Sequence, residues 1–199
     1  MVIDLNPKYD LEITRLMWFQ ECHNRYYHQD IYHLQLMPTL NHFYKHIMKY
    51  HSRIESARLM EQDYNHIIID GLICCISALS TLRYNPMRTY KNDYKGSTFH
   101  DLNMEAVMPR WDDLTRIGVR IGKALEGFDH LEDINYRQTL CAAFTDMFLV
   151  HWGLWLSNGN KSFIRPYVAR LQEIKRNNIF HDYLVEVTPK FSLDGVEIK

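Results

Sequence analysis

The stretch that decides the fold is YNHIIIDGLICCISALSTL, residues Tyr64 to Leu82, which is almost entirely apolar but carries one carboxylate, Asp70, near its middle. If this stretch is helical, its polar residues recur at helical spacing and form one narrow stripe along an otherwise apolar rod. The residues of this stripe are Asp63, His66, Asp70, Ser77 and Thr81. The pattern predicts a central helix of an all-α protein, in which the buried Asp70 needs a partner.

A second apolar helix with an embedded aspartate is predicted 76 positions later, where CAAFTDMFLVHWGLWL surrounds Asp146. The segments before the two central helices also correspond, at a shift of 74 positions. Apolar residues match apolar residues, a basic row matches a basic row, and Glu55 matches Asp129. We therefore predict an antiparallel helical bundle built from two related helical hairpins. The alternative is that two ordinary amphipathic hairpins only look alike.

We expect a single domain over residues 1–199. It would comprise an N-terminal helical segment (1–37), a first hairpin (38–86), a second hairpin (110–160) and a C-terminal helix with a tail (161–199). Asn6-Pro7 is typical of a helix start, and Pro38 indicates a boundary. In the tail, VEVTPKFSLDGVEIK alternates apolar and polar residues around Asp194-Gly195, which predicts a short β-hairpin or an extended end.

The composition bounds the function. A net charge of −1 and a pI near 6.8 give no strong nucleic-acid signal and no attraction to anionic membranes. No apolar run approaches the about 20 residues that cross a bilayer, and the N-terminus lacks the pattern of a signal peptide. We therefore expect a cytoplasmic protein with no membrane partner. The cysteines show no metal-binding spacing and read as reduced core thiols: Cys22, Cys74, Cys75 and Cys141.

Basic side chains recur at helical spacing ahead of each central helix, so they form continuous rows. The first basic row is His42, His46, Lys49 and Arg53, and the second basic row is Arg116, Arg120 and Lys123. Lysine, arginine and protonated histidine bind phosphates directly. The candidate phosphate-binding residues are therefore His42, His46, Lys49, Arg116, Arg120 and Lys123. On the C-terminal helix, by contrast, we interpret Arg165, Arg170, Lys175 and Arg176 as a solvated face.

Two stretches resemble the all-α nucleoside triphosphate pyrophosphohydrolases of the MazG-like superfamily. They are IGVRIGKALEGFDHLED followed by TLCAAFTDMFLVHWGLW, and HIMKYHSRIESA followed by IIIDGLICCISALSTL. In that family a helix with E-E-x-x-E faces a helix with E-x-x-D, and the carboxylates hold Mg²⁺. The resemblance implies a tandem copy that imitates the family's dimer. It also implies Mg²⁺ as a cofactor, with Asp70, Asp146, Glu55 and Asp129 as the candidate metal ligands.

The chain departs from that family at most of the metal ligands. The E-E-x-x-E positions fall near Lys45, His46 and Lys49 in the first half and near Val119, Arg120 and Lys123 in the second. Ile67 and Ala143 stand where the second motif has its glutamate. Mg²⁺ needs hard oxygen ligands, so the departures argue against retained pyrophosphohydrolase activity. The resemblance then implies a protein that binds a nucleotide or another phosphorylated ligand between its hairpins.

The residues leave other functions open. Asp70 could pair with His42, His46 or His66, and Asp146 with a cation of the second basic row, as structural ion pairs. The chain would then be a non-enzymatic protein–protein interaction protein, as a monomer or a homodimer. These three histidines together with Asp70 could also hold a transition metal. What separates these readings is whether the basic rows face an open cleft or are paired with the two aspartates.

Overall fold

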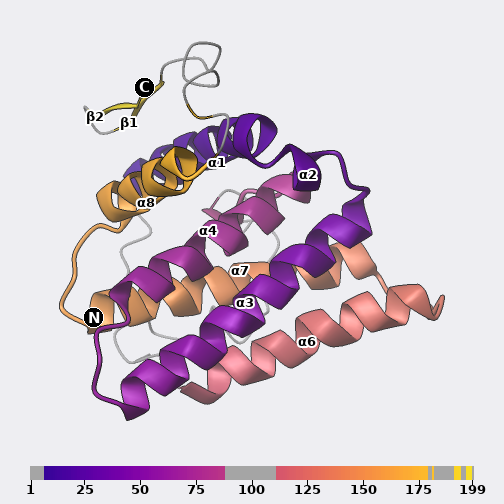
Figure 1. Cartoon of the computed structure of the whole chain (residues 1–199). Helices are drawn as coiled ribbons and strands as arrows, with labels where there is room; N and C mark the ends of the chain where they lie inside the picture. The colour runs from indigo at the N-terminus through magenta and orange to yellow at the C-terminus, as the bar shows by residue number, and fades with distance from the viewer. Residues whose placement is uncertain (1–6, 88–110, 179–180, 182–190, 194–195, 199) are drawn as a thin grey trace.

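The computed structural model describes residues 7–87, 111–178, 181, 191–193 and 196–198 (Figure 1). The expected all-α fold class is confirmed, because helices make up nearly all of the described chain. In chain order they are α1 (Pro7–Tyr27), α2 (Gln29–Tyr32), α3 (Leu36–Leu59), α4 (Asn65–Thr81), α6 (Trp111–Asp129), α7 (Tyr136–Ser157) and α8 (Ile164–Arg176).

Near the C-terminus, β1 (Phe191–Leu193) and β2 (Val196–Ile198) pair antiparallel, with Phe191 opposite Ile198. The residues between them, Asp194-Gly195, lie outside the described residues, and so does the turn that the sequence predicts there. The same holds for the Asn6 cap and for residues 88–108 of the expected connection between the hairpins.

The core forms around α4 and α7. Every residue of α4 from Ile67 to Ser80 is buried, and so are most residues of α7 between Leu140 and Trp155. Such a helix is apolar on all sides because it has neighbours on all sides. The central position that the sequence predicts for both helices is confirmed by this burial.

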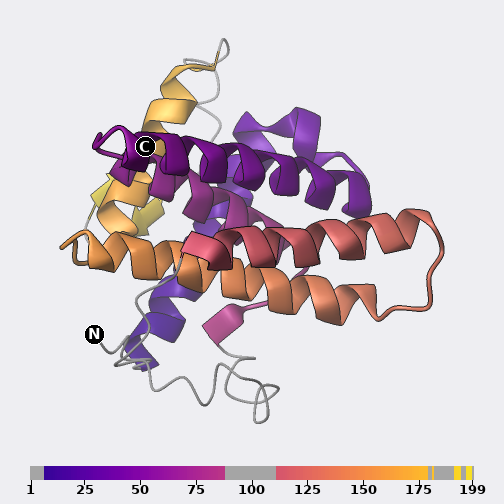
Figure 2. The same cartoon turned by 90° about the horizontal axis from the view of Figure 1, so that it is seen from below.

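The remaining helices cover these two. α3 packs along α4, α6 packs along α7, α4 crosses α7, and α3 lies against α6 (Figures 1 and 2). α1 and α8 lie against α4 on the side away from α6, as Figure 1 shows. Thus α4 contacts four other helices, and side chains from helices other than α3 can reach its one carboxylate.

Pro38 lies within the first turn of α3 rather than at a boundary before it. The helix begins at Leu36, two residues earlier than the proline. A proline in the first turn loses no intrahelical hydrogen bond, because the first backbone N–H groups of a helix have no partner within it. The actual break in the helices falls at His33 to Gln35, between α2 and α3.

The turns after α3 and α6 are alike. Each helix is followed by a residue in the left-handed conformation, Glu61 (φ 54°) or Leu131 (φ 55°), and the next residue donates back to the last turn. The ends of the two helices, Leu59 and Asp129, are 70 positions apart. A shift of 74 or 76 positions therefore does not superimpose the two turns, and Asp146 lies deeper into its helix than Asp70.

One described helix, α7, is long and apolar enough to cross a membrane by length and composition alone. Within the protein, 78% of that apolar stretch is buried, as expected for a core helix. The cytoplasmic location expected from the sequence stays a prediction.

Candidate functional site

Asp146 of α7 is held by an arginine of the neighbouring α6. Its Oδ2 accepts a hydrogen bond of 2.6 Å from a terminal nitrogen of Arg120. Burial raises the pKa of Asp146, and the Arg120 hydrogen bond and the charge of Arg116 act in the opposite direction. The ion pair between Asp146 and the second basic row, one of the alternatives in the sequence, is thus present.

Asp70 of α4 is held by Arg170, which comes from α8. The guanidinium donates from Nε to Oδ1 at 2.7 Å and from a terminal nitrogen to Oδ2 at 3.1 Å. Glu173 accepts from the other side of the same guanidinium at 2.8 Å. The hydrogen bond to Asp70 is the largest of several effects that raise the pKa of Arg170. This fork-to-fork geometry is the strongest form of an arginine–carboxylate contact.

Two expectations are corrected by this contact. Arg170 was expected on a solvated face, but it points inward and reaches a carboxylate whose side chain is 4% exposed. Asp70 was expected to pair with one of the histidines His42, His46 or His66, and that is wrong. The packing of α8 against α4 explains the outcome, because it brings the Arg170 guanidinium within 2.7 Å of the Asp70 carboxylate.

The second basic row is paired along its whole length. Besides Arg120, Arg116 donates to Asp113 on its own helix at 2.6 Å. Lys123 lies 3.4 Å from a carboxylate oxygen of Glu132 and 3.8 Å from one of Glu126. Each of these candidate phosphate-binding residues therefore has a carboxylate partner. A phosphate bound there would have to displace it.

The first basic row is different. The imidazoles of His42 and His46 lie with ring centroids 4.4 Å apart, and Lys49 Nζ lies 3.2 Å from His46 Nδ1. The Lys49 ammonium also sits 4.5 Å from the centroid of the Tyr50 ring. Within the described part of the chain, Lys49 and Arg53 form no ion pair with a carboxylate.

The electrostatics of the first basic row fix the state of His46. Burial, the Lys49 ammonium and the neighbouring His42 lower the pKa of His46 to about 4. The ring is therefore neutral near pH 7. Since an ammonium can only donate, His46 Nδ1 is the acceptor, and Nε2 carries the proton. Two residues of the row, His46 and Lys49, thus still present donors.

The candidate magnesium ligands are not brought together. Asp70 and Asp146 each bind an arginine, Glu55 binds Arg58 with oxygen–nitrogen distances of 2.6 and 3.1 Å, and Asp129 is the exposed last residue of α6. Among the described residues, no three His, Cys, Asp or Glu side chains are placed to share a metal ion. These residues do not fit Mg²⁺, which needs several free oxygens around one point. The expected histidine site for a transition metal finds no support either.

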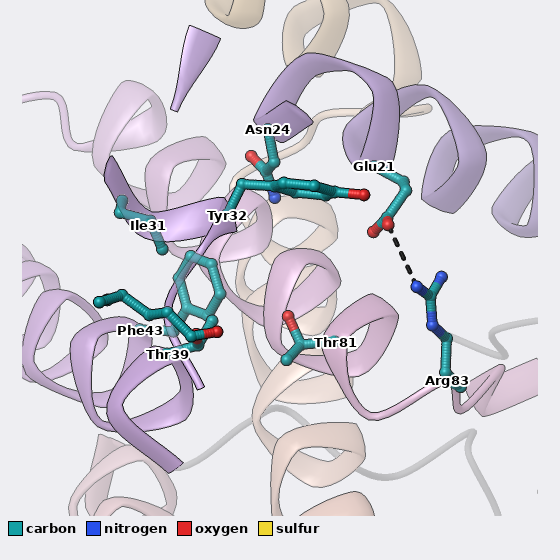
Figure 3. A pocket seen from close by; sticks show the side chains of 9 residues that line it. Glu21, Asn24, Ile31, Tyr32, Thr39, Phe43, Thr81 and Arg83 are labelled. Atoms are coloured by element: carbon teal, nitrogen blue, oxygen red, sulfur yellow. Dashed lines mark hydrogen bonds and ion pairs between the residues drawn. The ribbon is translucent and has the colours of Figure 1, made fainter. Parts of the chain in front are cut away.

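The four cysteines are buried free thiols, in agreement with the sequence interpretation. Burial raises the pKa of Cys74 to about 12, so this side chain behaves as a small apolar residue rather than as a nucleophile. A pocket of about 230 Å³ lies where α1, α2, α3 and the end of α4 meet (Figure 3). It is lined by none of the residues that the sequence predicts as a site.

Comparisons of this chain with protein-family models, with curated proteins and with solved structures find no match.

Proposed function

We propose that this protein binds a nucleotide or another phosphorylated small molecule, and that it does so through the first basic row. The observation that supports the proposal is the difference in pairing between the two rows. Lys49 and Arg53 have no carboxylate partner among the described residues, whereas Arg116, Arg120 and Lys123 each have one. A phosphate on α3 would meet Lys49 and Arg53 without breaking an ion pair with a described carboxylate, whereas on α6 it would have to break one.

The donors of the first basic row suit a phosphate. Lys49 supplies a charged ammonium, Arg53 a guanidinium, and His46 a neutral N–H from Nε2. Hydrogen bonds from charged donors to phosphate oxygens are about twice as strong as those between neutral groups. Binding would also favour a protonated His46, because a nearby anion stabilises the imidazolium.

The proposal is one of binding without hydrolysis. The resemblance to MazG-like pyrophosphohydrolases is the reason to choose nucleoside phosphates as probes. Catalysis in that family depends on carboxylates that hold Mg²⁺, and three of the four candidate carboxylates of this chain, Asp70, Asp146 and Glu55, are bound to arginines. In this proposal the two helix pairs, α3 with α4 and α6 with α7, are related hairpins of which only the first binds ligand.

The test is thermal unfolding of the full chain with nucleoside mono-, di- and triphosphates, each with and without Mg²⁺. A ligand at ~100 times its Kd adds about 2.7 kcal/mol to the free energy of unfolding. We expect such a shift without the metal, and we expect Lys49→Gln with Arg53→Gln to abolish it. The matched control is Lys123→Gln with Arg116→Gln on α6, which should leave the shift unchanged. A shift that needs Mg²⁺, or one that the α6 variant abolishes, would refute the proposal.

A second candidate function is supported by the two ion pairs of the central helices. Each aspartate is paired with an arginine of another helix, as expected if the two ion pairs only hold the helices in register. The surface also exposes large apolar side chains, including Trp18, Leu59, Met60, Val119 and Leu131. The chain would then be a protein–protein interaction module, with a second copy or another protein as partner. The absence of a shift with every phosphate probe would favour this function over the first.

A further inference from the structure

The pocket at the junction of α1, α2, α3 and α4 has an apolar side and a charged side. In Figure 3 the Tyr32 ring lies across the pocket, and Phe43 lies below it. At the other side Glu21 of α1 and Arg83, which follows α4, face each other, with their carboxylate oxygen and guanidinium nitrogen 3.4 Å apart. Such a division suits a small molecule with an apolar body and a charged head.

The polar lining offers acceptors. Thr81 donates its hydroxyl proton to the carbonyl of Ser77 at 2.9 Å, and Thr39 donates to the carbonyl of Gln35 at 2.9 Å. Because both protons are used within their own helices, the hydroxyl oxygens of these two lining residues are available to a ligand as acceptors. Together with the Glu21 carboxylate they can receive the protons of an ammonium group, which has three donors and no acceptor.

Arg83 supplies the complementary anion site. Its backbone is left-handed (φ 52°), and Tyr84 donates back to the carbonyl of Leu79, so Arg83 occupies the position after the helix end where glycine is preferred. An arginine in this left-handed conformation has a higher conformational free energy than a glycine, because its Cβ is close to the backbone. Its ion pair with Glu21 contributes little to stability, because the Arg83 side chain is 72% exposed. A ligand carboxylate would give the side chain a better partner.

We propose that this pocket binds an apolar α-amino acid, with the ammonium on Glu21 and Thr81, the carboxylate on Arg83 and the side chain against Phe43 and Tyr32. The two charges of such a zwitterion match the two charges of the rim. No residue of the first basic row lines the pocket, so the inference does not depend on phosphate binding.

The size of the pocket restricts the amino acid. An apolar cavity of about 150 Å³ accepts benzene, which has six non-hydrogen atoms, so a pocket of about 230 Å³ suits roughly nine. Leucine, isoleucine and methionine each have that number. Tryptophan is too large, and glycine lacks the apolar body.

The test is isothermal titration of the full chain with L-leucine and with two analogues, 4-methylpentanoate without the ammonium and 3-methylbutylamine without the carboxylate. We expect leucine to bind and each analogue to bind at least ~10-fold more weakly, since each analogue lacks one of the two charged groups that would form hydrogen bonds in the pocket. This comparison uses the unmodified chain, so it does not depend on the folding of a variant.

Variants then test which residue binds each charged group of the ligand. Arg83→Gln should weaken the binding of leucine at least ~10-fold but leave the binding of 3-methylbutylamine unchanged. Glu21→Gln should weaken the binding of leucine but leave the binding of 4-methylpentanoate unchanged. The matched controls are Arg165→Gln and Glu126→Gln, which lie on α8 and α6. Leucine binding should also survive Lys49→Gln with Arg53→Gln. Equal binding of leucine and its analogues, or no binding of leucine, isoleucine and methionine, would overturn the proposal.

Discussion

The two central helices meet the same requirement in different ways. Each buries one aspartate, and each aspartate is held by one arginine. For α7 the arginine is Arg120 on α6, the helix that precedes it in the chain. For α4 it is Arg170 on α8, a hundred positions away. The difference teaches that the basic row beside a buried carboxylate need not be its partner. Because Arg170 of α8 pairs with Asp70, Lys49 and Arg53 of α3 are left without a carboxylate partner among the described residues.

The two ion pairs also differ in strength. Asp70 and Arg170 make two hydrogen bonds, and their side chains are 4% and 28% exposed. Asp146 and Arg120 make one, and their side chains are 11% and 46% exposed. Water screens the second pair more and can replace its arginine more easily.

The largest expected effect comes from removing the two arginines in turn. Arg170→Gln leaves the Asp70 carboxylate buried without its charged partner, which costs about 3–5 kcal/mol for a buried pair. Arg120→Gln exposes Asp146 to water and should cost about 1 kcal/mol, as for a partly exposed pair. Urea unfolding at pH 7 measures both free energies. Equal losses in the two variants would mean that the halves do not differ in the way described.

A smaller effect distinguishes the contact between α4 and α7 from the contact between α3 and α6. A Cβ on Gly71 of α4 would lie 2.3 Å from Nε2 of the fully buried His151 of α7. A Cβ on Gly118 of α6 would lie 2.6 Å from Sδ of Met48, a flexible side chain that can move. For Gly71→Ala the overpacking cost of about 1–3 kcal/mol should exceed the gain of about 1 kcal/mol in helix propensity, because the fully buried His151 ring cannot move aside.

Gly118→Ala is the control for that substitution. The gain of about 1 kcal/mol in helix propensity should offset most of its packing cost, so the free energy of unfolding changes little. Both values come from the same urea unfolding measurement. If Gly71→Ala were as mild as Gly118→Ala, the contact between α4 and α7 would not be rigid.

The sequence predicts the elements well and the partners only in part. The apolar periodicity of α4 and α7 is long and unbroken, so both helices and their burial follow from it. The pair between Arg120 and Asp146 is among the expected alternatives because α6 and α7 are consecutive. Arg170 was missed because its partner lies on a distant segment. A signal was present, since Arg170 adjoins the buried Tyr167 and Leu171 on α8.

The pocket could not be predicted from any local pattern. Glu21 lies on α1 and Arg83 in the turn that follows α4, and the packing of α1 against α4 brings them together. Neither residue belongs to a motif that the sequence analysis could have found. The left-handed backbone of Arg83 is a tertiary feature too, because nothing in Leu82-Arg83-Tyr84 is typical of that conformation.

The smallest expected effect concerns a feature that the halves share. Leu131, 89% exposed, and Glu61 occupy the left-handed position after α6 and α3, where glycine avoids the steric cost of a side chain. Leu131→Gly and Glu61→Gly should each raise the free energy of unfolding by about 0.5–1 kcal/mol. The control is Leu131→Ala, which removes the exposed side chain but keeps the Cβ and should give no gain. A gain from alanine equal to that from glycine would assign the effect to the apolar surface. Similar gains from the two glycines, beside the unequal losses from the two arginines, would show that the halves share the backbone of their turns and differ in how the buried charge is paired.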